Sequence, residues 1–125
     1  MSRLEAKKTD PSSEKRLAKL RADYQRLKEQ IQSLSHVVPG SVQKRLYSCG
    51  KPNCRCVTEG RLHGPYYQWT RKIKGKTVNI NLDQETAVIV REWIRNDRQL
   101  RKLCSRLEKT SLAVLKIVAN LKKIE

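Results

Sequence analysis

The sequence predicts an α+β protein, in which two long heptad helices form an antiparallel coiled-coil hairpin. They flank a small three-stranded antiparallel β head with a zinc-knuckle-like loop. Apolar residues recur at heptad spacing toward both ends of the chain, which predicts the helices. Two alternating segments joined by a glycine turn lie in the middle and predict a hairpin. Three of the four cysteines cluster beside it, which predicts the metal loop.

The composition predicts a small protein with a modest core. A length of 125 residues and an aromatic content of 5% favour one small domain with extensions over a large enzyme interior. The chain shows no signal-peptide pattern, and no apolar run reaches the ~18 residues of a membrane span. We therefore expect a cytoplasmic protein that contacts neither a membrane nor a small-molecule substrate. In that compartment clustered cysteines are metal ligands more often than disulfides.

The positive charge is concentrated in the middle of the chain. The net charge is +16, and residues 41–82 carry nine basic side chains against one acidic side chain, Glu59. A region with almost no carboxylates attracts polyanions, nucleic acid first. The alternative is a general solubility charge, but a solubility surface normally mixes both signs.

Residues 1–12 are expected to form a disordered N-terminal tail, and residues 13–36 an N-terminal coiled-coil helix. The segment Asp10–Ser13 carries the start signal, because Asp and Ser cap helices and Pro is favoured in the first turn. The helix should end near Ser35, since Pro39 cannot continue it. Its heptad stripe consists of Leu17, Leu20, Tyr24, Leu27, Ile31 and Leu34.

Residues 40–82 are expected to form the β and zinc-knuckle head. Val42–Tyr47 reads as a short strand that enters the cysteine loop. Tyr66–Ile73 and Thr77–Leu82 read as a hairpin, with Lys74–Lys76 as the turn. Polar and apolar residues alternate along Thr77–Leu82, which places Val78, Ile80 and Leu82 on one face of that strand. A lone hairpin is marginal in water, so the third strand and a metal would stabilise it.

Residues 83–125 are expected to form a long C-terminal coiled-coil helix that Asp83 caps. Asn96 and Thr110 are polar intrusions in its stripe, and a break at Lys109–Ser111 is the alternative to one continuous helix. The two heptad positions hold Trp93, Leu100, Leu107, Val114 and Leu121, and Ile89, Asn96, Leu103, Thr110, Ile117 and Ile124. This helix is longer than its partner and more apolar at its end, which predicts a homodimer through it.

The cysteine cluster has the composition of a zinc site. The spacing C-x4-C-x-C-x6-H supplies four N/S ligands, and we predict one zinc per chain, held by Cys49, Cys54, Cys56 and His63. Cys54 and Cys56 should lie on the same side of an extended segment, because strand side chains alternate. Neighbouring cations should lower the pKa of the thiols; these are Lys51, Arg55 and Arg61.

Three other interpretations of the cluster stay open. The cysteines can form an unligated structural loop or a redox switch between Cys54 and Cys56. A catalytic Cys–His pair would need an orienting Asn or Asp, which nothing in the sequence indicates. Cys104 falls beside the helical stripe and is interpreted as a half-buried packing residue.

The motifs of the middle region resemble those of a known family. Cys49–Cys56 reads CGKPNCRC, His63–Tyr67 reads HGPYY, and Trp69 precedes the basic hairpin. They are similar to a prokaryotic domain-of-unknown-function family with a CGKPxCRC…HGPYY core. Further matches are Gly75–Thr77 and Arg91–Trp93, so the resemblance covers roughly residues 40–103 and leaves the first helix outside. It implies that the head is a recurring module, and it implies no activity.

The head combines cations with neutral groups that can read base edges. The expected contacts are Lys51, Arg55, Arg61, Tyr66, Gln68, Thr70, Arg71, Lys72, Lys74, Lys76, Asn79 and Asn81. Tyr67 and Trp69 are the alternative core of the head. Additional phosphate contacts are expected from the second helix at Arg91, Arg95, Arg98 and Lys102, although such a row is also typical of a solvated face.

These features favour a dimeric, zinc-stabilised nucleic-acid-binding protein. Double-stranded DNA is preferred because a small sheet can enter the major groove and a two-fold dimer suits a palindromic site. RNA or a single strand is the competing ligand, since exposed aromatic side chains stack on unpaired bases. A coiled-coil adaptor for an acidic protein partner is the second class. An enzyme is disfavoured, because the middle region has one carboxylate for metal-dependent chemistry.

Overall fold

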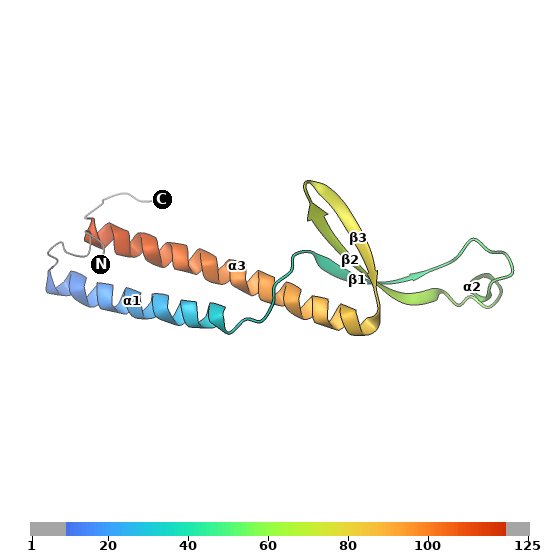
Figure 1. Ribbon diagram of the computed structural model, residues 1–125, viewed down its shortest axis with the longest axis horizontal. Helices are drawn as coiled ribbons and strands as arrows, with labels where there is room; N and C mark the ends of the chain where they lie inside the picture. Colours follow the sequence, from blue (N-terminus) through green and yellow to red (C-terminus); the bar gives the residue numbers. More distant parts are fainter. Residues whose placement is uncertain (1–9, 120–125) are drawn as a thin grey trace. The chain divides into compact units, whose positions relative to one another are not determined.

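The computed structural model describes residues 10–119. The elements follow the order α1, β1, α2, β2, β3, α3 (Figure 1), and the expected α+β class with a three-stranded antiparallel sheet is confirmed. The chain forms two compact units, which we call the helical unit, residues 1–35 and 98–125, and the sheet unit, His36–Asp97. The boundary between them falls inside α3.

Helix α1, Pro11–Gln32, starts where the capping signal predicts. The Asp10 carboxylate accepts a hydrogen bond from the Ser13 backbone N–H at 2.6 Å, and this bond lowers the pKa of Asp10. The predicted tail 1–12 was too long, because Pro11 and Ser12 are helical; its residues 1–9 lie outside the described residues. The helix ends at Gln32, before the expected Ser35: Ser33 is its C-cap, and the next N–H, that of Leu34, donates to the Ile31 carbonyl at 3.1 Å, which is a tighter turn than the α-helix makes.

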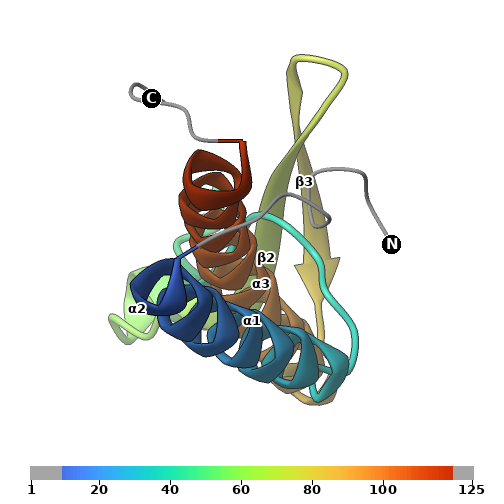
Figure 2. The same ribbon diagram turned by 90° about the vertical axis from the view of Figure 1, so that its left-hand side faces the viewer.

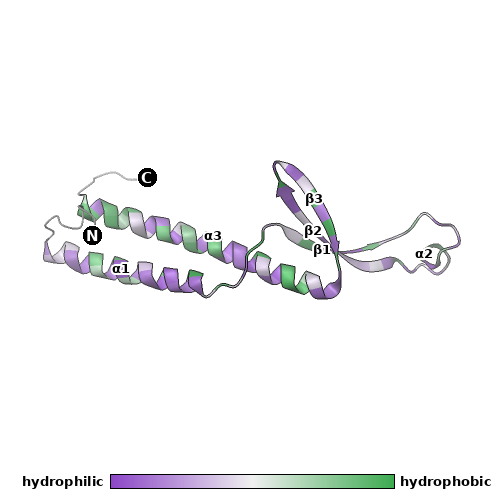
Figure 3. Cartoon of the chain, in the orientation of Figure 1, coloured by the Kyte–Doolittle hydropathy of each residue, from purple (hydrophilic) through white to green (hydrophobic). Residues whose placement is uncertain are grey.

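In the helical unit, α1 and the second part of α3 lie side by side and run in opposite directions (Figures 1 and 2). The buried side chains here are Leu17, Leu27, Leu103 and Val118. The α1 stripe is buried unevenly, because Tyr24 is 37% exposed. Figure 3 shows that apolar residues are more frequent toward the end of α3 than along α1. Across residues 10–119, no helix is long and apolar enough to cross a membrane.

Helix α3, Gln84–Val118, is continuous over 35 residues. Asp83 caps it as predicted, because its carboxylate accepts the Thr86 backbone N–H at 2.7 Å. The alternative of a break at Lys109–Ser111 is wrong. The Thr110 hydroxyl donates a hydrogen bond to the Arg106 carbonyl of the same helix at 2.9 Å, so this polar residue fits within the continuous helix. The predicted continuation over 120–125, with the heptad positions Leu121 and Ile124, lies outside the described residues.

The sheet consists of β1, Ser41–Tyr47, β2, His63–Ile73, and β3, Lys76–Leu82, with β2 in the centre. Both pairings are antiparallel. The hairpin turn is Lys74-Gly75 alone, with φ of 51° and 79°, as a two-residue type I′ turn requires. Lys76, which we expected in the turn, instead begins β3.

The first part of α3 packs within the sheet unit, and its buried face differs from the predicted stripe. Ala87, Val90 and Ile94 are buried, whereas Ile89 is 44% exposed. Tyr67 of β2 is buried as well, and the Arg91 guanidinium lies 5.5 Å from the centre of its ring. The heptad pattern misassigned this stretch because it assumed a helix as the only packing partner.

The segment before β1 lies against α3 and β2. The Val38 N–H donates to the Trp93 carbonyl at 3.3 Å, and the Asn96 side-chain amide donates to the His36 carbonyl at 2.9 Å. The Trp69 indole N–H donates to the Pro39 carbonyl at 2.9 Å. Asn96 is half-buried and donates a hydrogen bond to this segment, which explains a polar residue in the α3 stripe.

Candidate metal centre and nucleic-acid interface

The loop between β1 and β2 brings together four side chains, which we call the Cys/His cluster: Cys49, Cys54, Cys56 and His63. A turn reverses the chain, with the Cys54 N–H donating to the Lys51 carbonyl at 3.2 Å. The short helix α2, Arg55–Thr58, follows, and His63 begins β2. The cluster therefore collects its side chains from the end of β1, a turn, one helical turn and the start of β2.

The local backbone at the cluster differs from the expectation. Cys54 and Cys56 do not lie on one extended segment: Cys54 is the N-cap of α2, and Cys56 lies within the helix. The N–H groups of Val57 and Thr58 both donate to the Cys54 carbonyl at 3.0 Å. A helical turn that follows an extended N-cap residue also brings the Cys54 and Cys56 side chains to one point, so the four predicted ligands still lie together.

The four ligand atoms are close enough for one metal ion. They all lie within 4.8 Å of one another. The Cys49 and Cys56 sulfurs are 3.5 Å apart, and His63 Nε2 lies 3.2 Å from Cys49 Sγ and 2.9 Å from Cys54 Sγ. In a tetrahedral zinc site, Zn–S bonds of about 2.3 Å place two sulfurs roughly 3.8 Å apart. The donor set and its spacing are therefore compatible with a metal site.

The pKa of the Cys56 thiol is lowered in the cluster. Burial raises its pKa, but hydrogen bonds involving the Ser48 hydroxyl and Cys49 outweigh burial and lower the pKa to about 6. The pKa of Cys49 is raised: the Lys51 backbone N–H lowers it, but the neighbouring thiols and burial together outweigh that bond. These shifts come from hydrogen bonds and neighbouring thiols, and not from the surrounding cations that the sequence led us to expect.

The three cations of the loop are exposed side chains around the cluster. Lys51 lies in the turn, Arg55 begins α2, and Arg61 lies in the following loop. Arg61 Nε is 4.0 Å from a carboxylate oxygen of Glu59, which partly neutralises it. Cys104 takes no part in the cluster and is exposed on α3, where we had expected it to be half-buried.

The strand register sorts the sheet residues onto two faces, because side chains alternate along each strand. The first, which we call the polar face, consists of Ser41, Gln43, Arg45, Tyr66, Gln68, Thr70, Lys72, Thr77, Asn79 and Asn81. The second, the apolar face, consists of Val42, Lys44, Tyr67, Trp69, Arg71, Ile73, Lys76, Val78, Ile80 and Leu82. As predicted, the three apolar residues of β3 share a face, and Tyr67 and Trp69 lie there with them.

The predicted nucleic-acid contacts are divided between these faces. Tyr66, Gln68, Thr70, Lys72, Asn79 and Asn81 come together on the polar face. Arg71 lies on the apolar face, with its guanidinium 4.2 Å from the centre of the Trp69 ring and its Nε buried. Lys74 is in the hairpin turn, and Lys76 pairs with Ile73 at the end of the apolar face.

The predicted helix contacts belong to two units. Arg91 and Arg95 are in the sheet unit, whereas Arg98 and Lys102 are in the helical unit. Arg91 is half-buried beside Tyr67, and the other three are exposed. Arg91 therefore has a packing partner of its own, whereas Arg95, Arg98 and Lys102 are exposed side chains.

Two tyrosines connect the polar face to the Cys/His cluster. The rings of Tyr47 and Tyr66 are 5.0 Å apart, and their hydroxyls lie 3.3 Å from each other. Tyr47 also stacks on the His63 ring at 5.4 Å. The hydrogen bond and charge of Tyr66 raise the pKa of Tyr47. A change at the cluster can therefore move an aromatic pair at one end of the polar face.

The sequence reasoning missed the contribution of β1 and one position of β3 to the polar face. The missed residues of the polar face are Ser41, Gln43, Arg45 and Thr77, and Tyr47 beside it was missed as the partner of Tyr66. Polar and apolar residues alternate from Ser41 to Leu46, with Lys44 as the exception. That alternation was the available signal, because it places every second residue on the same face as the polar positions of β2.

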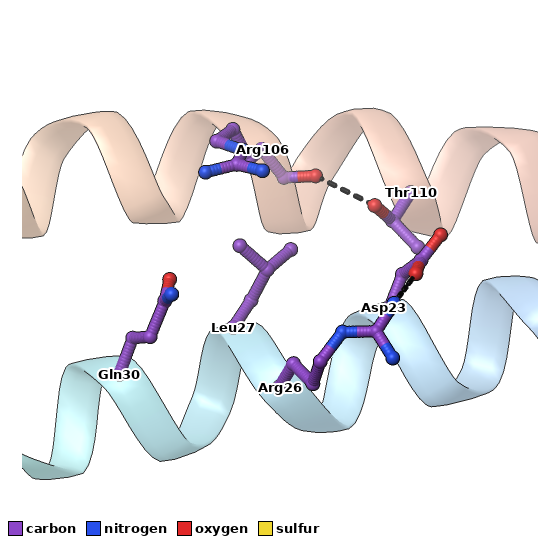
Figure 4. Close-up of a pocket in the computed structure, with 6 residues that line it drawn as sticks. All are labelled: Asp23, Arg26, Leu27, Gln30, Arg106 and Thr110. Atoms are coloured by element: carbon purple, nitrogen blue, oxygen red, sulfur yellow. Dashed lines mark hydrogen bonds and ion pairs between the residues drawn. The ribbon is translucent and has the colours of Figure 1, made fainter.

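A groove in the helical unit carries no comparable chemistry. Its volume is about 250 Å³, and its lining consists of Asp23, Arg26, Leu27, Gln30, Arg106 and Thr110 (Figure 4). The Asp23 carboxylate is paired with Arg26, and the Thr110 hydroxyl donates within its own helix. We assign no ligand to this groove.

A comparison with protein families gives one match. A family model described as a domain of unknown function, DUF6788, matches residues 17–95. The match begins within α1 and ends within α3, so it includes most of the first helix, which the motif resemblance left outside. No curated protein and no solved structure matches the chain.

Proposed function

The chain belongs to the DUF6788 family, and we propose that it binds double-stranded DNA through the polar face of its sheet unit. One observation carries the proposal. The strand register gathers ten polar or cationic side chains, none of them a carboxylate, on one face of a three-stranded sheet. Neutral amides and hydroxyls hydrogen-bond to base edges, and cations hold phosphates.

The dimensions and charge of the sheet support a groove-binding role. Three strands span about 10 Å between the outer strands, and the major groove of B-DNA is about 12 Å wide. Arg45 and Lys72 lie toward opposite ends of the polar face. Residues 41–82 carry nine basic side chains against one acidic side chain, and this excess of positive charge favours a polyanion as the ligand.

We propose zinc as the metal of the Cys/His cluster, with one ion per chain. Three thiols and one imidazole form a common structural zinc set, and free thiols fit the cytoplasmic location that the sequence predicts. The metal would hold the loop Ser48–Leu62 and, through His63 and Tyr47, the end of the polar face. Its role is structural, so no catalytic activity is proposed.

A mobility-shift titration with a short duplex at several salt concentrations tests the binding. The variant Arg45→Glu/Lys72→Glu changes two cations of the polar face, and Lys15→Glu/Lys19→Glu makes the same charge change on exposed positions of α1. We expect only the first variant to lose affinity strongly and to reduce the salt slope by about two, near 0.9 per lost phosphate contact. Equal losses in both variants would show that net charge alone drives the binding.

One observation favours single-stranded nucleic acid or RNA as a second candidate ligand. Tyr47 and Tyr66 lie together and are 47% and 38% exposed, and exposed aromatic rings stack on unpaired bases. Parallel titrations with duplex and single strands of one sequence, in DNA and RNA, separate the candidates. The second candidate requires tighter binding of the single strand and its loss in Tyr66→Ala.

We also propose that α1 and α3 pair as an antiparallel coiled coil and that the chain dimerises through the end of α3. The buried leucines Leu17, Leu27 and Leu103 support the pairing, and the apolar excess at the end of α3 supports the dimer. Sedimentation equilibrium at several concentrations should give twice the chain mass. A monomer that binds no nucleic acid at low salt but captures an acidic protein would favour the adaptor function instead.

A further inference from the structure

Two amides of the polar face have their carbonyl oxygens engaged within the face. The Arg45 guanidinium donates to Gln43 Oε1 at 2.8 Å, and the Thr70 hydroxyl donates to Asn79 Oδ1 at 2.8 Å. An amide whose oxygen accepts a bond in this way keeps its NH2 group available as a donor. Gln43 and Asn79 can therefore act as donors to a ligand.

Gln68 and Asn81 have a different status. They are direct register partners on β2 and β3, and in the part of the chain that the structure describes neither side chain makes a hydrogen bond. Each keeps one acceptor and two donors available. An amide with both groups free can form a paired donor and acceptor contact, which is the contact that adenine offers through N6 and N7 in the major groove.

We propose that Gln68 and Asn81 recognise adenine in the major groove, while Gln43 and Asn79 donate to acceptor edges of neighbouring base pairs. The proposal rests on the proposed binding of duplex DNA and names what the polar face reads. Arg45 and Lys72 hold phosphates on either side of the amides. The positive charge of the region and the absence of carboxylates from the polar face favour a nucleic acid, and the width of the three-stranded sheet, close to that of the major groove, favours a duplex as the occupant.

The spacing of the amides sets the length of the recognised site. Gln43, Gln68 and Asn81 form one row across the three strands, and Thr70 and Asn79 form the next row. Adjacent rows on one face are about 6.8 Å apart along a strand, which equals about two base steps of roughly 3.4 Å. The two rows of the sheet unit therefore address a short element of about three base pairs that contains adenine.

Selection from a random duplex library, followed by sequencing, tests the proposal with the full-length chain. The wild type should enrich one short adenine-containing element. Gln68→Ala/Asn81→Ala should lose discrimination on the order of tenfold per lost contact and keep salt-dependent binding to any duplex. The matched control is Gln25→Ala/Gln99→Ala, which removes two exposed amides of the helical unit and should enrich the wild-type element.

An isosteric variant gives the test a second readout, a changed base preference, besides the loss of discrimination. Gln68→Glu/Asn81→Asp replaces donor–acceptor groups by acceptors of the same shape, which match the amino group of cytosine. We expect the enriched element to change from adenine to cytosine at those positions.

Each contrary result has a separate meaning. Duplex binding without any enriched element overturns this inference and leaves the proposed DNA binding intact. Enrichment of the wild-type element by both double variants, Gln68→Ala/Asn81→Ala and Gln68→Glu/Asn81→Asp, also overturns this inference. A lack of duplex binding by the wild type overturns the proposed function together with the inference, and tighter binding of single-stranded RNA does the same.

Discussion

Replacing Cys54 with serine removes one of the four ligands of the Cys/His cluster, and the size of the effect follows from the loop that the cluster closes. The span Cys49–His63 contains 15 residues, and Cys56 is its one buried residue. The loop has no apolar core of its own, so its order depends on the cross-link. In the chain-entropy treatment of cross-links, closing a loop of 15 residues contributes about 3 kcal/mol.

This free energy predicts a large thermal shift. For a unit of this size, each kcal/mol moves the melting temperature by about 4–8 °C, so Cys54→Ser should melt about 12–24 °C below the wild type. Trp69 and Trp93 both lie in the sheet unit, so tryptophan fluorescence reports its unfolding. The control is Cys104→Ser, which changes an exposed thiol outside the cluster.

Metal analysis of the same proteins completes the experiment. The wild type and Cys104→Ser should each carry about one equivalent of zinc, and Cys54→Ser far less, because a structural site needs all four ligands. The reasoning is refuted if the wild type, never exposed to a chelator, holds under about half an equivalent. It is equally refuted if both serine variants melt at the same temperature.

Four further substitutions test the fold. Gly75→Ala adds a methyl group at φ 79° into open space and should cost about 1–2 kcal/mol. Gly40→Ala, at φ 104°, would in addition bring the new Cβ into a clash with the Thr70 carbonyl oxygen of β2 and should cost about 1–3 kcal/mol more. Equal losses of unfolding free energy in urea for the two variants would contradict the register. The hydrogen bond from the Thr86 N–H lowers the pKa of the Asp83 carboxyl from its ordinary value of 3.8. The ionised carboxylate therefore stabilises the fold at pH values above 3.8, and this stabilisation is lost as the pH falls through the lowered pKa. Unfolding curves of Asp83→Asn, a cap that does not titrate, should lack that acid-dependent loss; the same loss in both proteins would exclude the cap as its source. Leu103→Ala removes most of a side chain that is 1% exposed and leaves a cavity, so it should destabilise the helical unit by about 2–5 kcal/mol. Denaturation followed by circular dichroism measures this loss, and a loss below about 1 kcal/mol would contradict the packing.

Local signals predicted the element boundaries that depend on neighbouring residues alone. Asp10 and Asp83 each cap a helix through a bond to a backbone N–H three residues later. Gly75 located the hairpin turn correctly, but the predicted turn Lys74–Lys76 was one residue too long, because Lys76 already pairs with Ile73. The donor set of the Cys/His cluster was also predictable, because its residue types are rare outside metal sites at this density.

Features that depend on distant partners were not predictable in the same way. A heptad pattern cannot tell whether a helix packs on another helix or on a sheet, and so it placed Ile89, instead of Val90 and Ile94, in the buried face. The pair Cys54 and Cys56 fits both an extended and a helical loop, and the turn of α2 decided between them. The division of the cations into two sheet faces required the strand register.

The central claim is that the polar face contacts DNA, and the side-chain amide signals of Gln43, Gln68, Asn79 and Asn81 in an NMR titration with a short duplex test it most directly. These signals should shift on addition of the duplex, while those of Gln25 and Gln99 in the helical unit stay in place. Shifts confined to the helical amides, or no shift at a duplex concentration that gives binding in solution, would contradict the claim.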